Sequence, residues 1–135
     1  LDEKINGDAD DRKIIFVYDP AGNKGKSWLT RYWFSTRNDV LRLSIGKRDD
    51  LAYAIDVTKK LFVFDVPRQT MKHLQYCVLE MIKDQMIFSP KYESVCKIIP
   101  HKCHVVVFCN EAPDLTMMSL DRFEIIDLSD NNIIN

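Results

Sequence analysis

One stretch of the chain, residues 14–27, constrains its fold more than any other. It begins with the β-branched and aromatic run Ile-Ile-Phe-Val-Tyr, continues into a loop with two glycines, and ends in Gly-Lys-Ser before a segment that starts at Trp28. The residue types and their spacing predict a strand, a loop and then a helix over residues 27–35. The N-terminal end of such a helix carries partial positive charge and faces the loop, so this stretch favours a bound anion.

The loop has the residue types that hold a nucleoside triphosphate. Gly22 and Gly25 let the backbone turn its N–H groups around an anion. Lys26 can reach the β- and γ-phosphates, and the Ser27 hydroxyl can ligate Mg²⁺. Further nucleotide contacts are expected from the neighbouring residues Asn23, Lys24 and Trp28. The structural alternative is an ordinary turn followed by a capped helix.

The bulk composition is that of a single globular domain. The chain has 135 residues, of which 46% are hydrophobic and 29% are charged, and its formal net charge is −1. A near-neutral charge provides no general attraction to nucleic acid, so any such binding requires a local basic element. No apolar run approaches the ~20 residues that cross a membrane, and the sequence therefore predicts no membrane partner.

The four cysteines are interpreted as free thiols in a reducing compartment, because they fall inside predicted elements rather than in a loop-rich framework. They are Cys77, Cys96, Cys103 and Cys109. A zinc site that adds His101 and His104 is disfavoured, since the spacing matches no standard ligand pattern. Strand alternation also places His104 on the opposite face from Cys103 and Cys109.

Short apolar strands alternate with helices, which predicts an α/β domain with a mostly parallel central sheet flanked by helices. The expected strands cover residues 13–18, 40–45, 61–66, 103–109 and 123–128. Residues 69–84 carry apolar side chains at helical spacing and are expected to form the longest helix. Residues 89–102, with prolines near both ends and interleaved basic residues, are expected to form a protruding basic hairpin.

Both ends of the chain are expected to lie outside this domain. Residues 1–11 are polar and show no periodicity, so they are interpreted as a lead-in that is partly disordered or as a linker stub. Residues 12–128 are assigned to the domain, and residues 129–135 to a polar C-terminal tail.

Polar residues follow three predicted strands at the sheet edge where ligands bind in α/β folds. Lys26, Asp65 and Asn110 are expected to converge there. Asp65 can hold Mg²⁺ together with Ser27, and Asn110 can orient the attacking water or sense the γ-phosphate. A strand-end cap for Asp65 and a turn residue for Asn110 are the alternatives.

Two further groups are candidates for contacts with anionic ligands. Arg122 is the candidate cation that stabilises charge on a transferring phosphoryl group, often in a neighbouring subunit's site. The alternative is a surface ion pair with Asp121 or Glu124. The predicted hairpin offers basic and aromatic residues that can hold a phosphodiester backbone, unless it is simply a solvated charged loop. These residues are Lys91, Tyr92, Lys97, His101 and Lys102.

Five motifs together resemble a known family. They cover residues 16–27, 64–68, 89–93, 106–110 and 119–123. In this order they resemble the successive motifs of the superfamily-three helicase domain in replication-initiator (Rep) proteins of small circular single-stranded DNA viruses. The nanovirus, alphasatellite and circovirus-like group is the most similar. The resemblance runs from about Arg12 to Asp127, which is nearly the whole chain.

The resemblance implies a P-loop domain of the AAA+ type with ATP and Mg²⁺ as cofactors. It implies a DNA helicase that forms a ring, usually a hexamer, and moves along single-stranded DNA during rolling-circle replication in the host nucleus. An N-terminal nicking endonuclease domain is the implied partner, and its metal and tyrosine motifs are not found in this sequence.

The resemblance also assigns roles residue by residue. Lys26 and Ser27 match the family's phosphate and magnesium residues, and Asp65 matches its second acidic motif. Asn110 matches the polar sensor and Arg122 the arginine finger. The basic residues of the predicted hairpin fall in the stretch that corresponds to the family's pore hairpin.

Two positions depart from the usual patterns, one in the phosphate loop and one in the family's acidic motif. Pro20 stands where the phosphate loop usually has its first glycine. Asp65 is followed by Val66, although many members have a second acid there that activates water. Glu80 and Glu111 are candidate substitutes for that acid.

The leading hypothesis is therefore an ATP-hydrolysing DNA helicase domain. The missing second acid keeps open a rival from another class, an ATP-dependent assembly or DNA-binding module without efficient hydrolysis. A kinase for a small substrate is disfavoured, because the sequence has no basic lid loop.

Overall fold

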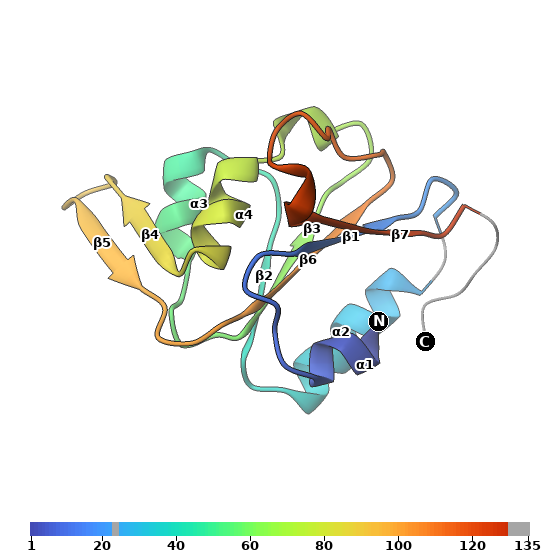
Figure 1. Cartoon of the computed structure of the whole chain (residues 1–135), viewed down its shortest axis with the longest axis horizontal. Coiled ribbons are helices and arrows are strands. Elements are labelled where there is room, and N and C mark those ends of the chain that lie inside the picture. The colour runs from blue at the N-terminus through green and yellow to red at the C-terminus, as the bar shows by residue number, and fades with distance from the viewer. Residues whose placement is uncertain (23–24, 130–135) are drawn as a thin grey trace.

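The computed structural model describes residues 1–22 and 25–129 (Figure 1). Its helices are α1 (Asp2–Asn6), α2 (Lys26–Thr36), α3 (Arg48–Ala54) and α4 (Tyr76–Lys83), with 3₁₀ turns at Met71–His73 and Leu120–Arg122. Its strands are β1 (Ile14–Tyr18), β2 (Val40–Leu43), β3 (Leu61–Asp65), β4 (Met86–Ser89), β5 (Val95–Ile98), β6 (His104–Cys109) and β7 (Phe123–Asp127).

Five strands form the central sheet, in the order β2-β3-β6-β1-β7. Every neighbouring pair is parallel. The central strand β6 is buried along its whole length, as a nearly continuous apolar run requires in a sheet covered on both faces. The predicted α/β class, with a mostly parallel sheet flanked by helices, is therefore confirmed.

Alternate residues of the strands pack against two different layers of helices. Phe16, Phe64 and Val107 share one core cluster with residues of α3 and α4. Val17 and Phe108 point to the other face and share a second cluster with residues of α1 and α2. Figure 1 shows these two helix pairs on opposite sides of the sheet. The period-two pattern of each strand thus builds both halves of the core.

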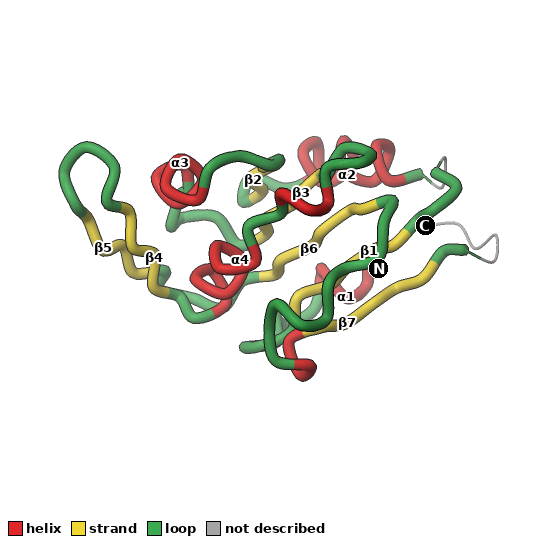
Figure 2. The backbone as a smooth tube through the Cα atoms, turned by 90° about the horizontal axis from the view of Figure 1, so that it is seen from above, coloured by secondary structure: helices red, strands yellow, loops and turns green. Residues whose placement is uncertain are grey.

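The predicted hairpin is present and begins three residues before the expected position 89. Strands β4 and β5 are antiparallel and form a separate two-stranded sheet, with Met86 opposite Ile98 and Phe88 opposite Cys96. Figure 2 shows this hairpin extending beyond the end of the main sheet. None of the described helices is long and apolar enough to cross a membrane.

The prediction of one long helix over residues 69–84 is wrong. Residues Met71–His73 form a 3₁₀ turn, Leu74 is extended, and α4 has eight residues, so α2 with 11 residues is the longest described helix. Met71 and Leu74 are nevertheless both buried. A 3₁₀ turn also places residues i and i+3 on one side, so apolar spacing alone does not distinguish it from an α-helix.

The expectation that residues 1–11 are partly disordered is also wrong. Residues Asp2–Asn6 form α1, and Ile5 is only 1% exposed. The indole N–H of Trp33 donates to the Asp2 carboxylate at 2.8 Å. One buried side chain in a five-residue helix produces no periodicity, so sequence patterns do not reveal it. Of the predicted tail, only Ser129 lies within the described residues.

Candidate functional site

The loop after β1 lies at the carboxyl edge of the central sheet. Gly22 and Gly25 both have positive φ angles, of 78° and 93°, in the region that glycine enters without strain. Gly25 is the N-cap of α2, so the free N–H groups of the first turn of this helix face the loop. Asn23 and Lys24, which the sequence assigns to the nucleotide, lie outside the described residues.

Arg68, which follows β3, closes over this loop. Its guanidinium donates to the carbonyl oxygen of Ala21 at 3.2 Å. A Cβ atom on Gly22 would lie 2.5 Å from Nη2 of Arg68, which is the end of a flexible side chain and can shift, so the positive φ angle is what favours glycine at this position. The contact joins residues 47 positions apart, and for that reason no local pattern predicts it.

Asp19 is a functional candidate that sequence reasoning missed. Its side chain is fully buried, and Oδ1 accepts a hydrogen bond from the Gly22 N–H at 2.9 Å. Oδ2 lies 3.8 Å from Nζ of Lys26 and has no hydrogen-bond partner among the described residues. A buried carboxylate is costly unless it is paired, so the Lys26 ammonium balances this charge. The sequence did contain one signal for this role, because Asp19 is an acidic residue at the start of a loop that contains two glycines.

Lys26, Ser27 and Asp65 line one cavity of about 320 Å³. The structure therefore brings together the lysine, the hydroxyl and the carboxylate that the sequence places at three different positions. An ammonium, a hydroxyl and a carboxylate beside free helix N–H groups can hold a triphosphate and a Mg²⁺ ion. The donor set thus fits the two predicted cofactors.

Arg42 of β2 lines the same cavity and was not predicted. Its guanidinium donates to the Asp65 carboxylate at 2.8 Å, and both side chains are about half exposed. The Ser44 hydroxyl holds the Asp65 backbone through a 3.0 Å bond to its carbonyl oxygen. The strand order explains the pair, because β2 and β3 are adjacent and parallel.

Asn110 follows β6 at the same edge but does not line this cavity. Its side-chain amide donates to the Asp19 carbonyl oxygen at 2.7 Å, which fixes it against the start of the phosphate loop. Glu111 is exposed next to it. Trp28 is also exposed, and its ring stacks on Tyr32 one helical turn later, with the centroids 5.3 Å apart.

Arg122 lies at the opposite edge of the sheet, immediately before β7. Its side chain is buried; Nη2 donates to Asp84 at 2.7 Å, and Nε lies 3.5 Å from the Glu80 carboxylate. Glu80 is therefore not near Lys26 of the same chain. Of the two candidate substitutes for the missing acid, only Glu111 lies at the carboxyl edge.

The predicted nucleic-acid residues separate into two groups. On the hairpin, Lys91 pairs with Asp50, and Tyr92 packs edge-on against Tyr53 at 5.2 Å. Lys97 donates to three carbonyl oxygens at the end of α3, the closest at 2.7 Å. These contacts fasten the hairpin to α3.

His101 and Lys102 form the second group. They lie before β6, at the amino edge of the central sheet. The His101 ring bonds to the Lys59 carbonyl oxygen at 2.8 Å, and Lys102 is exposed. The sequence joins both groups in one hairpin, whereas the structure separates them.

The cysteines agree with the interpretation as free thiols. Burial raises the pKa of Cys103 to about 11 and that of Cys109 to about 12, so both remain protonated at neutral pH. Both belong to the core cluster on the α3 and α4 side of the sheet. Among the described residues no group of three or more His, Cys, Asp or Glu side chains is arranged to hold a metal ion.

Known proteins resemble the chain in both sequence and fold, although no protein-family model matches it. It is 38% identical over 132 residues to Para-Rep C1 of Milk vetch dwarf C1 alphasatellite, which covers 93% of this chain and 44% of that protein. It is 42% identical over 127 residues to Para-Rep C9 of Faba bean necrotic yellows C9 alphasatellite, covering 93% and 43%.

A solved structure, the A form apo structure of NrS-1 C terminal region-CTR, is similar in fold. It has a TM-score of 0.55 and covers 88% of this chain and 29% of that chain, at 14% sequence identity. The chain spans less than half the length of the Para-Rep proteins it matches. Over that span, the chain is a homologue of the Para-Rep proteins of alphasatellites.

Proposed function

We propose that this chain is the ATP- and Mg²⁺-dependent DNA helicase domain of a replication initiator of the Rep type. The observation that carries the proposal is the cavity shared by Lys26, Ser27 and Asp65, beside a glycine loop and the start of α2. The Para-Rep relatives support a role in replication. In full-length form the protein would add a nicking endonuclease domain and would work in the host nucleus.

The residues of the cavity have separate proposed roles in phosphoryl transfer. Lys26 and the first N–H groups of α2 hold phosphate oxygens, while Ser27 and Asp65 offer oxygen ligands to Mg²⁺. ATP and Mg²⁺ supply the transferable phosphoryl group and the neutralising charge. Asn110, which is fixed by the Asp19 carbonyl oxygen, orients a water molecule or senses the γ-phosphate.

Assembly into a ring, with a hexamer as the expected form, would join the nucleotide cavities of neighbouring chains. Arg122 is then the proposed arginine finger. Since Asp84 and Glu80 hold its guanidinium, this role requires both contacts to open when the chains associate. Mutation of Arg122 must therefore be assessed for folding and for hydrolysis separately.

A module that binds ATP and DNA without efficient hydrolysis is the second candidate. It is favoured by the buried Val66, which occupies the position of the usual second acid, and by the distance of Glu80 from the cavity. Single-turnover hydrolysis with and without single-stranded DNA separates the two functions. The helicase predicts turnover that DNA stimulates, and the module predicts binding without turnover.

Calorimetric titration with ATP and Mg²⁺ tests the step that both candidates share. Wild type and Lys72→Ala, which removes a lysine outside this cavity, are expected to bind equally well. Lys26→Ala is expected to bind about 100-fold more weakly. Equal affinity in all three proteins would contradict the assignment of the cavity.

A further inference from the structure

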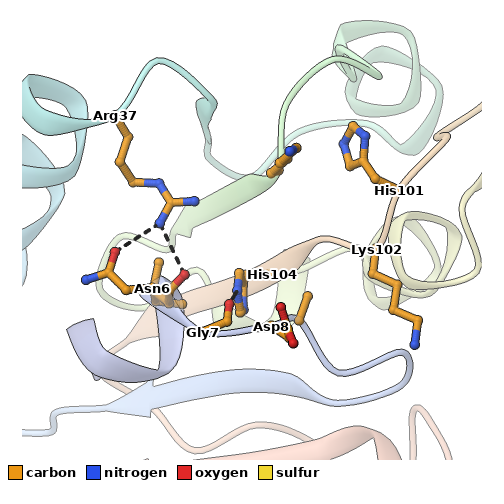
Figure 3. Close-up of a pocket in the computed structure, with 10 residues that line it drawn as sticks. Asn6, Gly7, Asp8, Arg37, His101, Lys102 and His104 are labelled. Carbon is orange, nitrogen blue, oxygen red and sulfur yellow. Dashed lines mark hydrogen bonds between the residues drawn. The ribbon is translucent and has the colours of Figure 1, made fainter.

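A second cavity, of about 460 Å³, lies at the amino edge of the sheet (Figure 3). Lys60 precedes β3, and His101 and Lys102 precede β6. Arg37, which follows α2, His104 of β6 and residues 5–9 complete the lining. Adjacent parallel strands begin at the same edge, so the sheet topology gathers basic residues that are far apart in the sequence.

The cavity carries more positive charge than a chain with net charge −1 suggests. Lys60 and Lys102 are exposed, and within residues 1–22 and 25–129 neither side chain has an ion pair or a hydrogen bond. Arg37 differs, since it forms two bonds to Asp39, at 2.8 and 3.0 Å. Asp8 is the single acidic residue among the lining residues. Two ammonium groups without a direct ion pair therefore border a polar hollow, although the Asp39 carboxylate attracts Lys60 through space.

Backbone carbonyls orient the two imidazole rings of this cavity. His101 Nε2 lies 2.8 Å from the Lys59 carbonyl oxygen, and His104 Nε2 lies 3.0 Å from the Gly7 carbonyl oxygen. A carbonyl only accepts hydrogen bonds, so Nε2 of each ring carries the proton. In Figure 3, His101 and Lys102 stand on one side of the cavity and Arg37 on the other, with His104 between them. Polar residues thus lie on several sides of the cavity.

We propose that this cavity binds a phosphate group of a single-stranded nucleic-acid backbone. The ammonium groups of Lys60 and Lys102 suit a phosphate, whereas the lining has no Phe, Tyr or Trp ring on which a base would stack. The hairpin lysines are less suited, because Lys91 pairs with Asp50 and Lys97 caps α3. The choice of nucleic acid over free phosphate rests on the proposed function.

A pair of matched double variants tests the proposal. Lys60→Gln/Lys102→Gln removes the two free ammonium groups, and Lys47→Gln/Lys72→Gln removes two lysines from a separate cavity at the other edge. Binding of fluorescent oligo-dT is measured by anisotropy without nucleotide, over a range of salt concentrations. Loss of one phosphate contact lowers the salt slope by about 0.7, so the first variant is expected to lose about 0.7 in slope and about fivefold in affinity near 0.1 M salt. Equal losses in both variants would overturn the proposal.

A second measurement distinguishes the source of the phosphate. Inorganic phosphate is titrated while the imidazole NMR signals of His101 and His104 are followed in wild type and in Lys60→Gln/Lys102→Gln. Shifts that the double variant abolishes, together with its weaker DNA binding, support a backbone site. Phosphate-dependent shifts with unchanged DNA affinity would assign the cavity to a free anion and overturn the nucleic-acid assignment. Failure of ATP to bind at Lys26 would refute the proposed function. The anisotropy and NMR measurements do not depend on ATP, so they would still test this cavity.

Discussion

The two edges of the central sheet use charged side chains in different ways. At the carboxyl edge Lys26 and Asp65 line an open cavity, and they pair with the side chains of Asp19 and Arg42 rather than with backbone carbonyl groups. At the amino edge Arg37, His104 and Lys83 each donate to a backbone carbonyl, those of Ile5, Gly7 and Asp10. These three bonds fasten the N-terminal segment to the domain. The comparison teaches that charge at one edge is available for binding, whereas much of the charge at the other holds the fold together.

The physical reason is the direction of the parallel strands. Loops that leave the carboxyl ends of the strands turn into helices whose first N–H groups have no partner within the helix, and this leaves binding groups free. At the amino edge the segment that precedes β1 lies across the starts of the other strands, and its carbonyl groups need donors. Long basic side chains supply them.

The largest effect is expected from Lys26 at the carboxyl edge. Lys26→Ala removes the cation closest to the proposed phosphates, and charge-assisted bonds of this kind contribute up to about 3 kcal/mol, so ATP affinity should fall about 100-fold. Isothermal calorimetry measures the change. Lys26→Arg keeps a cation beside Asp19 and serves as the folding control. If Lys26→Ala binds ATP with unchanged affinity, charged side chains at the carboxyl edge do not serve ligand binding, and the contrast with the amino edge fails.

A loss of stability is expected from Arg122 at the amino edge. Arg122→Met leaves Glu80 and Asp84 without their shared guanidinium, and the free energy of unfolding should fall by about 2–3 kcal/mol. Urea denaturation measures it. Arg12→Met breaks the exposed ion pair with Asp121 and should cost under ~1 kcal/mol. If the two variants are equally stable, Arg122 is not a structural residue and is free to act in a neighbouring site.

A smaller loss is expected from Lys83. Its ammonium donates to the Cys103 carbonyl oxygen at 2.7 Å and to the Asp10 carbonyl, so Lys83→Met should cost about 1–2 kcal/mol for two unsatisfied acceptors. Burial lowers the pKa of Lys83 below its ordinary value of 10.5, so above the folded-state pKa the unfolded chain binds more protons. Wild-type stability should therefore rise with pH through that window relative to Lys83→Met, as pH-dependent urea curves would reveal. A constant difference between the two proteins would show that the buried ammonium does not titrate there.

The smallest effect on stability is expected from Arg42. Its ion pair with Asp65 is about half exposed, so Arg42→Gln should change the free energy of unfolding by less than ~1 kcal/mol. The same variant should lower the Mg²⁺ concentration needed for ATP binding, since it removes a cation that competes for the carboxylate. Titration with Mg²⁺ at fixed ATP checks this. A higher Mg²⁺ requirement would mean that Arg42 assists the site directly.

Sequence patterns succeeded where local residue type controls the structure. The five parallel strands were predicted because buried β-branched runs fit a sheet covered on both faces. The Gly-Lys-Ser segment was placed at the start of a helix, and Asp65 at the end of a strand. Patterns failed for α1 and for residues 69–75, where short elements produce too few repeats to define a period.

The sequence by itself determined the α/β class, the order of strand, loop and helix around Lys26, and the homology with Para-Rep proteins. Only the tertiary structure decided which charges meet. It placed Arg42 on Asp65, Asp19 beneath Lys26, Arg122 between Glu80 and Asp84, and Lys60 beside Lys102. These groupings depend on the order of the strands in the sheet and on the edge at which each residue lies. Parallel neighbouring strands are joined by crossover connections, which bring together residues that are far apart in the chain.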